Sequence, residues 1–270
     1  KFNLNDTAYD IDNKLSKTQL PLILKKGEFN DDEGTNQADV EYTQELKFTN
    51  RGGNSGEKSI WYIYDQNSEL SDRTVGDYLY LSKASDAYAW VYEFNLDSAI
   101  TVANSADLES TQMELLGRLF TVSSAAFTTG NVTKLTLLAG DVTQVVATGD
   151  TVNGVKLVAV DTNGNSCTIE YQGETVTINK GSTKTMGDGT IIGVSKVTPS
   201  NKQATPDYCQ LNFGADKVEL EDAKEIKVNG EKVLGSKVTF GSTTGFDVFN
   251  VSYKPQNKVY INPGEEYKDP

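Results

Sequence analysis

Alternation of apolar and polar residues is the dominant pattern along the chain. The alternating segments are rich in β-branched and aromatic residues, which is typical of strands that bury one face. They are SIWYIYD (59–65), YLYLS (78–82), AWVYEFNL (89–96), LFTVSS (119–124), KLTLLAG (134–140), KLVAVD (156–161), CTIEYQG (167–173), CQLNFG (209–214) and FDVFNVSYK (246–254). Glycine, asparagine and aspartate clusters separate them at intervals of about 8 to 12 residues. The pattern predicts a mainly β protein with sandwich-like domains and few short helices.

One segment departs from this alternation. In SKTQLPLILKK (16–26), Ser16 is placed to cap a helix, Pro21 lies near its first turn and Gly27 follows its end. These start and stop signals predict a short helix. The segment 106–116 is also compatible with a short helix.

Glycines that directly precede a strand recur in the C-terminal half. Each is followed by two strand-like segments separated by a loop, which predicts a hairpin, and three of them follow Asn or Asp as in type I′ turns. The landmark glycines are Gly117, Gly154, Gly189 and, in a degenerate copy, Gly230. Periods of this size indicate a β unit that needs a neighbour to complete its core. We therefore expect four imperfect repeats (117–153, 154–188, 189–229 and 230–270), although chance pairings in a glycine-rich β protein are the alternative.

The N-terminal part differs in composition from these repeats. It contains more tyrosine and tryptophan, an acidic cluster at 31–34 and a polar, glycine-rich segment at 50–58. Near 100–112 most residues are small and polar, as is typical of linkers. This predicts an N-terminal β-rich domain over 1–105, containing the helix near 16–26, and a C-terminal β domain over 106–270.

Charge and composition exclude several functions. The 38 acidic and 25 basic residues give a net charge of -13, which repels phosphate backbones and anionic headgroups, so nucleic acid is not an expected partner. No apolar run approaches the roughly 18 to 20 residues that span a bilayer, so no membrane insertion is expected in this segment. The sequence contains no histidine, which removes Ser-His-Asp and Cys-His catalysis and the usual zinc and non-haem iron sites.

Six segments of the sequence carry a family resemblance. They are LPLILKKGEFNDDEG, VYEFNLDSAITVANSADLE, MELLGRLFTVSSA, KLTLLAGDVTQ, DGTIIGVSKV and GADKVELED. Over roughly 18–270 the chain resembles the surface-layer (S-layer) proteins of archaea, in which LLG-x-x-(Y/F)-T-V is followed by LTLL-x-G. The resemblance implies an extracellular, usually glycosylated protein without enzymatic activity that assembles with itself into a lattice on the cell envelope, with a longer chain than this one.

Two other function classes remain open. Trp61, Tyr62, Tyr64 and Trp90 could stack on sugars in a cell-surface adhesin or carbohydrate-binding module, but their alternation favours burial. A glycosidase with two carboxylates has no local sequence signature and is the least favoured class.

Three N-x-S/T sequons are candidate glycosylation sites, at Asn5, Asn131 and Asn250. Asn131 is the preferred acceptor because it lies in a predicted hairpin loop, where a glycan would be exposed to solvent. Chance occurrence in a chain rich in Asn, Ser and Thr is the alternative.

Acidic clusters are candidate calcium sites, because calcium binds six to eight oxygen ligands in flexible geometry. Asp31, Asp32 and Glu33 are the first choice, with Glu265, Glu266 and Asp269 second; we expect calcium to bridge copies that their charge otherwise keeps apart. A solvated loop that only keeps the protein soluble is the alternative. The D-x-N-x-N pattern at Asp161 lacks the glycine and glutamate of an EF-hand and is better explained as a hairpin turn.

The two cysteines occupy near-equivalent positions in consecutive repeats. Cys167 shares a strand face with Ile169, and Cys209 shares one with Leu211, so both sulfurs are expected to point inward. If the two strands are neighbours, a disulfide would be within reach. Two buried free thiols are the alternative.

Overall fold

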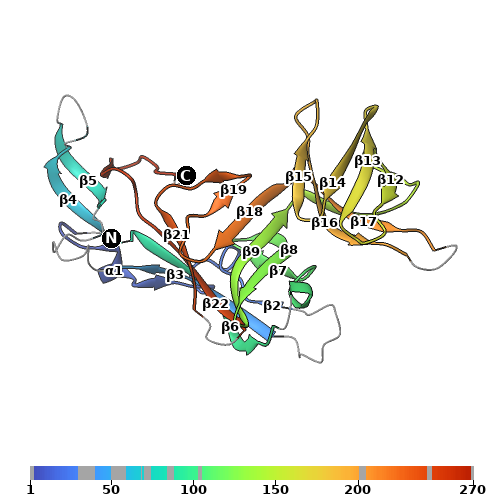
Figure 1. The fold of residues 1–270 in the computed structure, drawn as a ribbon. Helices are drawn as coiled ribbons and strands as arrows, with labels where there is room; N and C mark the ends of the chain where they lie inside the picture. Colours follow the sequence, from blue (N-terminus) through green and yellow to red (C-terminus); the bar gives the residue numbers. More distant parts are fainter. Residues whose placement is uncertain are drawn as a thin grey trace.

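The computed structural model describes residues 3–29, 40–49, 59–67, 69, 74–83, 88–102, 105–200, 205–241 and 245–268. Within these ranges the chain forms antiparallel sheets that are arranged as three parts in a row (Figure 1). A central body of two six-stranded sheets lies between a small three-stranded sheet and a module of two four-stranded sheets. The prediction of a mainly β, sandwich-like protein is confirmed.

The body packs two sheets face to face. The first has the order β1-β3-β6-β22-β21, with β2 also on β3: β1 (Lys14–Leu15), β2 (Gly27–Phe29), β3 (Val40–Phe48), β6 (Trp90–Ile100), β22 (Phe246–Tyr253) and β21 (Ser236–Phe240). The second has the order β20-β19-β18-β9-β8-β7: β20 (Glu231–Lys232), β19 (Lys227–Val228), β18 (Asp216–Glu221), β9 (Asn131–Ala139), β8 (Arg118–Thr128) and β7 (Gln112–Leu115). A short 3-10 helix, η2 (Ser105–Asp107), precedes β7.

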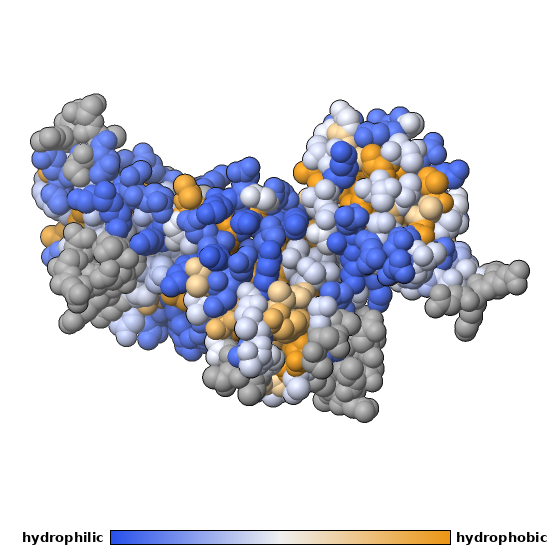
Figure 2. All heavy atoms as spheres, viewed as in Figure 1, coloured by the Kyte–Doolittle hydropathy of each residue, from blue (hydrophilic) through white to orange (hydrophobic). Residues whose placement is uncertain are grey.

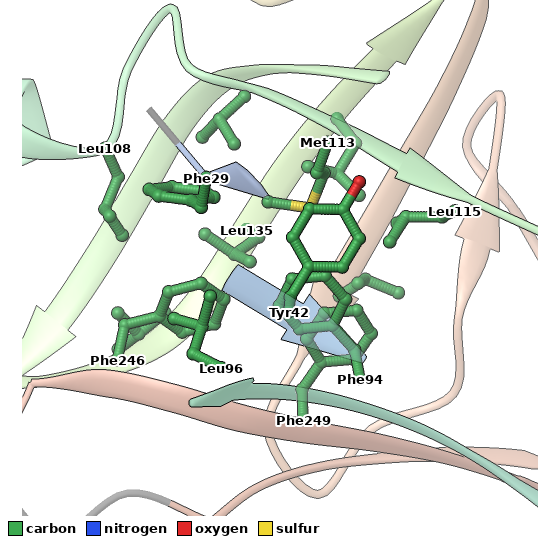
Figure 3. Close-up of a cluster of buried hydrophobic side chains, with 14 of the residues drawn as sticks. Phe29, Tyr42, Phe94, Leu96, Leu108, Met113, Leu115, Leu135, Phe246 and Phe249 are labelled. Carbon is green, nitrogen blue, oxygen red and sulfur yellow. The ribbon is translucent and has the colours of Figure 1, made fainter. Parts of the chain in front are cut away.

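An aromatic cluster forms the core of the body (Figure 3). The Phe94 ring lies 4.7 Å from that of Tyr42 and 5.0 Å from that of Phe249, measured between centroids. Phe94 comes from β6, Tyr42 from β3 and Phe249 from β22. Alternation places these rings on one face of the sheet, and Leu135 of β9 packs against them from the facing sheet.

The module is an excursion from one hairpin of the body. β9 and β18 pair directly, up to Ala139 opposite Asp216, and the intervening chain leaves and returns at this point. Its sheets have the orders β10-β17-β16-β15 and β11-β12-β13-β14: β10 (Val142–Ala147), β17 (Tyr208–Phe213), β16 (Ile191–Thr198), β15 (Ser182–Thr185), β11 (Thr151–Val152), β12 (Val155–Val160), β13 (Ser166–Tyr171) and β14 (Glu174–Asn179). Gly140 is required where the chain enters, because a Cβ there would lie 2.9 Å from the Phe213 carbonyl oxygen.

The third part joins the two ends of the described chain. Its sheet has the order β23-β5-β4: β23 (Val259–Ile261), β5 (Val75–Leu81) and β4 (Ile60–Gln66). Next to it lies the single α-helix among the described residues, α1 (Ala8–Ile11), which a capping box at Thr7 begins. No helix in these ranges combines the length and the apolar character that crossing a membrane requires.

The predicted domain boundary near residue 105 does not separate the sheets. β22 pairs with β6 and β23 pairs with β5, so strands from residues 236–261 complete sheets that begin within residues 1–105. The separate unit is instead the module between Gly140 and Ala215. Sequence alternation identified the strands, but it carries no information about which distant strand each one pairs with.

The predicted hairpins are confirmed, whereas the equivalence of the repeats is not. Antiparallel hairpins pair β8 with β9, β12 with β13, β16 with β17 and β21 with β22. The four landmark glycines all have positive φ, between 78° and 89°. The third strands differ: β14 pairs with its own hairpin, whereas β10 pairs with β17 and β18 pairs with β9. Similar local units therefore enter different sheets.

The predicted helix over 16–26 is absent. Ser16 does begin a turn, since its carbonyl oxygen accepts from Leu20 N (2.9 Å) and its side chain contacts Gln19, but a second, separate turn follows at Leu20 to Leu24. Pro21 has no N–H to continue the ladder. Burial also opposes a helix, because Leu24 is buried while Leu22 is 81% exposed. The segment 106–116 likewise enters β7 after the single turn of η2.

Candidate assembly and modification sites

A disulfide joins the two sheets of the module. Cys167 lies on β13 and Cys209 on β17, their Cα atoms are 6.5 Å apart, and both residues are fully buried. Ile169 and Leu211 flank them in the same core cluster, so both sulfurs point inward, as the alternation predicted. The structure thus contains the disulfide rather than two buried thiols. It ties together strands from two facing sheets, where it restricts their separation.

The first-choice calcium residues, Asp31, Asp32 and Glu33, lie outside the described residues, as does Asp269. Glu265 is described, and its carboxylate accepts hydrogen bonds from the backbone and side chain of Asn262 (3.2 and 2.8 Å), which caps a turn. Glu266 is exposed. Across the described ranges, no group of three or more acidic or cysteine side chains is placed to hold a metal ion.

The interpretation of the Asp161 pattern as a hairpin turn is confirmed. The Asp161 carboxylate accepts from the backbone N–H groups of Asn163 and Asn165, both at 3.2 Å. Gly164 supplies a positive φ of 73° within this turn. The carboxylate therefore organises its own loop, as Asx turns do.

The three sequons differ in exposure, and the expectation that Asn131 lies in a hairpin loop is wrong. Asn131 is the first residue of β9, not a loop residue, and its side-chain oxygen is buried without a hydrogen-bond partner beside Gly245. Asn250 lies within β22, between β6 and β21, and its side-chain oxygen is also buried and unpartnered. Asn5 is exposed and precedes α1. Asn5 is therefore the sequon that a glycan can reach without disturbing a sheet.

Three of the four aromatic residues considered for sugar stacking are half-buried. Trp61 and Tyr62 face opposite sides of β4, and the Trp90 ring stacks on Tyr253 at 5.4 Å between centroids. Tyr64 is the exception, at 64% exposure. The alternation favours burial of these rings, and three of the four are partly buried but none is fully buried.

A polar cleft of about 390 Å³ lies between the body and the module, and sequence reasoning missed it. Glu28 and Gln112 line it from the body, and Lys196 and Gln210 from the module. Glu114 lies at its wall and accepts from Lys25 Nζ at 2.9 Å; this hydrogen bond raises the pKa of Lys25. Burial raises the pKa of the neighbouring Tyr42 hydroxyl, which accepts from the Glu114 backbone N–H at 2.8 Å. The cleft presents amides and charges rather than apolar surface.

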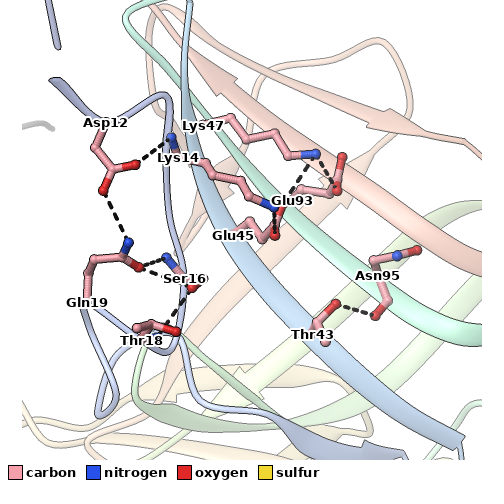
Figure 4. Close-up of polar contacts among 10 residues, drawn as sticks. All are labelled: Asp12, Lys14, Ser16, Thr18, Gln19, Thr43, Glu45, Lys47, Glu93 and Asn95. Atoms are coloured by element: carbon pink, nitrogen blue, oxygen red, sulfur yellow. Dashed lines mark hydrogen bonds and ion pairs between the residues drawn. The ribbon is translucent and has the colours of Figure 1, made fainter. Parts of the chain in front are cut away.

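Charged side chains of both signs cover the outer face of the β1-β3-β6 sheet (Figure 4). Lys14 donates to Glu45 and Lys47 donates to Glu93, both at 2.6 Å, and Lys47 also lies 3.5 Å from Glu45. Burial alone raises the pKa of Glu45, but the two lysines outweigh it and the pKa is lowered. Cross-strand pairs of this kind stabilise a half-exposed sheet face by about 1 kcal/mol or less each. They keep this face polar, and the structure gives no sign of a catalytic arrangement among these paired residues.

The edges of the sheets differ in how they are protected. Charged residues on an edge strand discourage pairing with another chain. In the described ranges, every edge strand of four or more residues contains a charged residue, except β10. The charged residues are Asp65 on β4, Glu114 on β7, Glu174 on β14, Lys184 on β15 and Lys237 on β21. β10 reads VTQVVA.

Exposed apolar side chains accompany this uncharged edge. Val142 is 42% exposed and Val145 is 66% exposed. On the face shown in Figure 2, hydrophilic residues cover most of the described surface, and apolar patches lie on the module and on the lower part of the body.

Comparisons with protein-family models, with curated protein sequences and with solved structures give no match.

Proposed function

We propose that this chain is a structural component of an archaeal cell-surface lattice (S-layer) and that it assembles with copies of itself outside the cell. The proposal rests on the sequence resemblance described above. It gains support from the buried disulfide between Cys167 and Cys209, because such bonds persist in oxidising, extracellular surroundings. It also agrees with an arrangement of three β parts in a row, which presents a long surface to neighbours.

The structural observation that best supports self-assembly is the uncharged edge strand β10. Along one side of an edge strand, backbone N–H and C=O groups have no strand to pair with, and a second strand can bind them. β10 has six residues, four of which are valine or threonine with high strand propensity, and it contains no charged residue and no proline, in a chain whose net charge is -13. Two copies can therefore approach each other at β10 without repulsion between like charges in the strand itself.

Electron microscopy of negatively stained protein tests the proposal. We expect the purified chain to form sheets or arrays in millimolar calcium, and we expect Val145→Lys to abolish them because it places a charge on the β10 edge. Val158→Lys is the matched control, since Val158 is 40% exposed on β12, an interior strand of the same module. Monodisperse protein under all these conditions would contradict assembly. If the Val145→Lys variant still forms arrays, β10 is not part of the interface between copies.

Calcium dependence is tested in the same experiment. If carboxylates such as Asp31 and Asp32 bridge copies through calcium, assembly fails in chelator with sodium chloride of equal ionic strength. The substitutions Asp31→Asn and Asp32→Asn then abolish the calcium requirement or the arrays. Equal assembly in both salts supports general screening of the negative charge instead.

Carbohydrate binding by a cell-surface adhesin is the second candidate function. The polar cleft favours it, because the amides of Gln112 and Gln210 and the carboxylate of Glu28 can exchange hydrogen bonds with sugar hydroxyl groups. A glycan array with the wild-type chain and with Gln112→Ala and Gln210→Ala checks this function. Binding that the two substitutions abolish favours the adhesin, and the absence of binding to any glycan contradicts it.

A further inference from the structure

The two sheets of the body form a second cavity beside the aromatic cluster, and this cavity opens to the surface. It measures about 360 Å³ and lies between β6 and β22 on one side and β8, β9 and β18 on the other. Trp90 and Tyr253 line it from the first sheet, and Leu137 and Leu220 from the second. Leu116, which is 52% exposed, lies at its margin, so the cavity reaches the surface there.

The walls of this cavity are almost wholly apolar. Apart from the tyrosine hydroxyl groups and the Trp90 indole N–H, Arg118 and Ser236 are the polar side chains of the described lining, and both are engaged by protein groups. Arg118 Nη1 donates to the Asp216 carboxylate. Ser236 Oγ donates to the Val233 carbonyl oxygen at 2.6 Å and accepts from the Ile226 N–H at 2.9 Å.

The two tyrosines of the lining are engaged as well. Tyr92 donates to Gln44 Oε1 at 2.6 Å, and the Tyr253 and Tyr267 hydroxyl oxygens lie 2.9 Å apart. The hydroxyl groups therefore contact protein partners, and the rings contribute apolar surface to the cavity. Where a ligand in this cavity contacts the walls, it meets mainly carbon atoms.

The size of the cavity exceeds what packing imperfections produce. Protein interiors contain few voids larger than one water molecule, whose share of liquid volume is about 30 Å³. An engineered apolar cavity of about 150 Å³ stays dry and binds benzene. A cavity of about 360 Å³ falls within the range of roughly 300 to 1,000 Å³ that ligand sites occupy.

We propose that this cavity binds the hydrocarbon chain of a neutral apolar molecule, such as a long-chain alcohol. Apolar walls favour a hydrocarbon over a sugar or nucleotide, which would leave its polar groups unpaired. The charge of Arg118 is balanced by Asp216, so the lining formed by the described residues offers no free cation for an anionic headgroup. A neutral headgroup therefore fits the margin better than a charged one. This inference is independent of lattice assembly.

Tryptophan fluorescence gives a direct test, because the chain has two tryptophans and one lines the cavity. In Trp61→Phe, Trp90 is the sole tryptophan, and a long-chain alcohol that carries bromine should quench it saturably. In Trp90→Phe, where Trp61 remains, the same titration should give no saturable quenching. Absence of saturable quenching of Trp90, or equal quenching of the two tryptophans, would overturn the proposal.

A blocking variant separates the cavity from unspecific adsorption. Val233→Phe, made in the Trp61→Phe background, adds a ring to the lining and should weaken binding of the alcohol at least tenfold. Val158→Phe, in the same background, adds the same ring to an exposed position of the module and should leave binding unchanged. Thermal unfolding verifies that both variants are folded. Undiminished binding by a folded Val233→Phe variant would contradict the site.

Headgroup preference is tested with two probes of the same chain length. The neutral alcohol should bind Trp61→Phe at least as tightly as the corresponding carboxylate at pH 8. If only the carboxylate binds, the neutral class is wrong and Arg118 acts as an anion receptor.

Discussion

The body and the module both bury an apolar core between two β-sheets, but they assemble from very different stretches of sequence. In the body, Trp90 of β6 stacks on Tyr253 of β22, so residues that are far apart in the sequence meet. In the module, every buried core residue lies between Val146 and Leu211. The module is therefore a local unit, whereas the body exists only when both ends of the chain have come together. Contacts of long sequence separation are slower to form.

The two cores also differ in composition. The fully buried side chains of the body include Phe29, Phe94, Phe246 and Phe249. The buried core of the module holds only aliphatic residues, Met186 and the two cysteines, with Tyr171 and Phe213 partly buried at its margin. Aromatic residues bury about 150 to 250 Å² each, so the body gains more from each core position. The module buries a smaller apolar core, and its disulfide adds stabilisation that this core lacks, as disulfides do in small extracellular domains.

Excision of the module is the most severe test of this comparison. We expect a chain in which Asn-Gly replaces residues 140–215 to keep the body folded, because Ala139 and Asp216 are already paired neighbours and Asn-Gly favours a tight hairpin turn. Amide hydrogen exchange should show protection of β9 and β18 like that in the full chain. Loss of protection throughout β9 and β18 would mean that the body depends on the module.

Removal of the disulfide is expected to have the next largest effect. The bond closes a loop with a sequence separation of 42, for which the chain-entropy model gives a stabilisation of about 4 kcal/mol. Cys167→Ala combined with Cys209→Ala should lower the unfolding temperature of the module and leave that of the body in place. Quantitative alkylation of both cysteines in denatured, unreduced wild-type protein would show that the bond does not form in solution.

A matched pair of core truncations sharpens the comparison further. Leu157 in the module and Leu135 in the body are both fully buried, and Leu→Ala at either should cost about 2 to 5 kcal/mol. We expect Leu157→Ala to destabilise the module alone and Leu135→Ala to destabilise the body, as read by hydrogen exchange at each site. If both variants shift one common transition by equal amounts, the two cores unfold as a single unit.

The sequence predicted what depends on nearby residues. Period-two alternation located the strands around Leu157 and Ile169, and Asn-Gly pairs located their turns, since both signals act over a few residues. The direction of the cysteine side chains followed from the same alternation. The disulfide was foreseen as a possibility for this reason, although its formation depends on β13 and β17 lying in facing sheets.

Features that depend on distant contacts were not predictable. Nothing within β22 specifies β6 as its neighbour, and so the boundary at residue 105 was placed wrongly. The sequence predicts Asn131 in a solvent-exposed loop, but Asn131 forms a β-bridge with Gly245, and the side-chain oxygen of Asn131 is buried. The apolar cavity arises from the way two sheets separate, which no local pattern encodes. The polar cleft likewise requires the module and the body to be placed together.

The smallest predicted effect concerns an ion pair between the paired strands β9 and β18 of the body. Glu219 of β18 accepts from Lys134 of β9 at 2.9 Å, and this hydrogen bond lowers the pKa of Glu219. A carboxylate whose pKa is lowered by folding contributes stability above its unfolded pKa of about 4.3 and loses that contribution as the pH falls through its folded pKa. Glu219→Gln should therefore destabilise the body by about 0.5 kcal/mol at pH 7, as a partly exposed pair does.

The same substitution should lose its effect in acid. As the pH falls below the unfolded pKa and then through the lower folded pKa, the wild-type carboxylate becomes protonated, so the difference in unfolding free energy between wild type and Glu219→Gln should shrink toward zero. Urea unfolding of both proteins from pH 7 to pH 3 measures this, with Glu266→Gln as an exposed control of the same chemistry. High salt should reduce the pH 7 difference as well, because exposed pairs are screened. A difference that persists unchanged at pH 3 and in high salt would assign the loss to packing around Glu219 rather than to its charge.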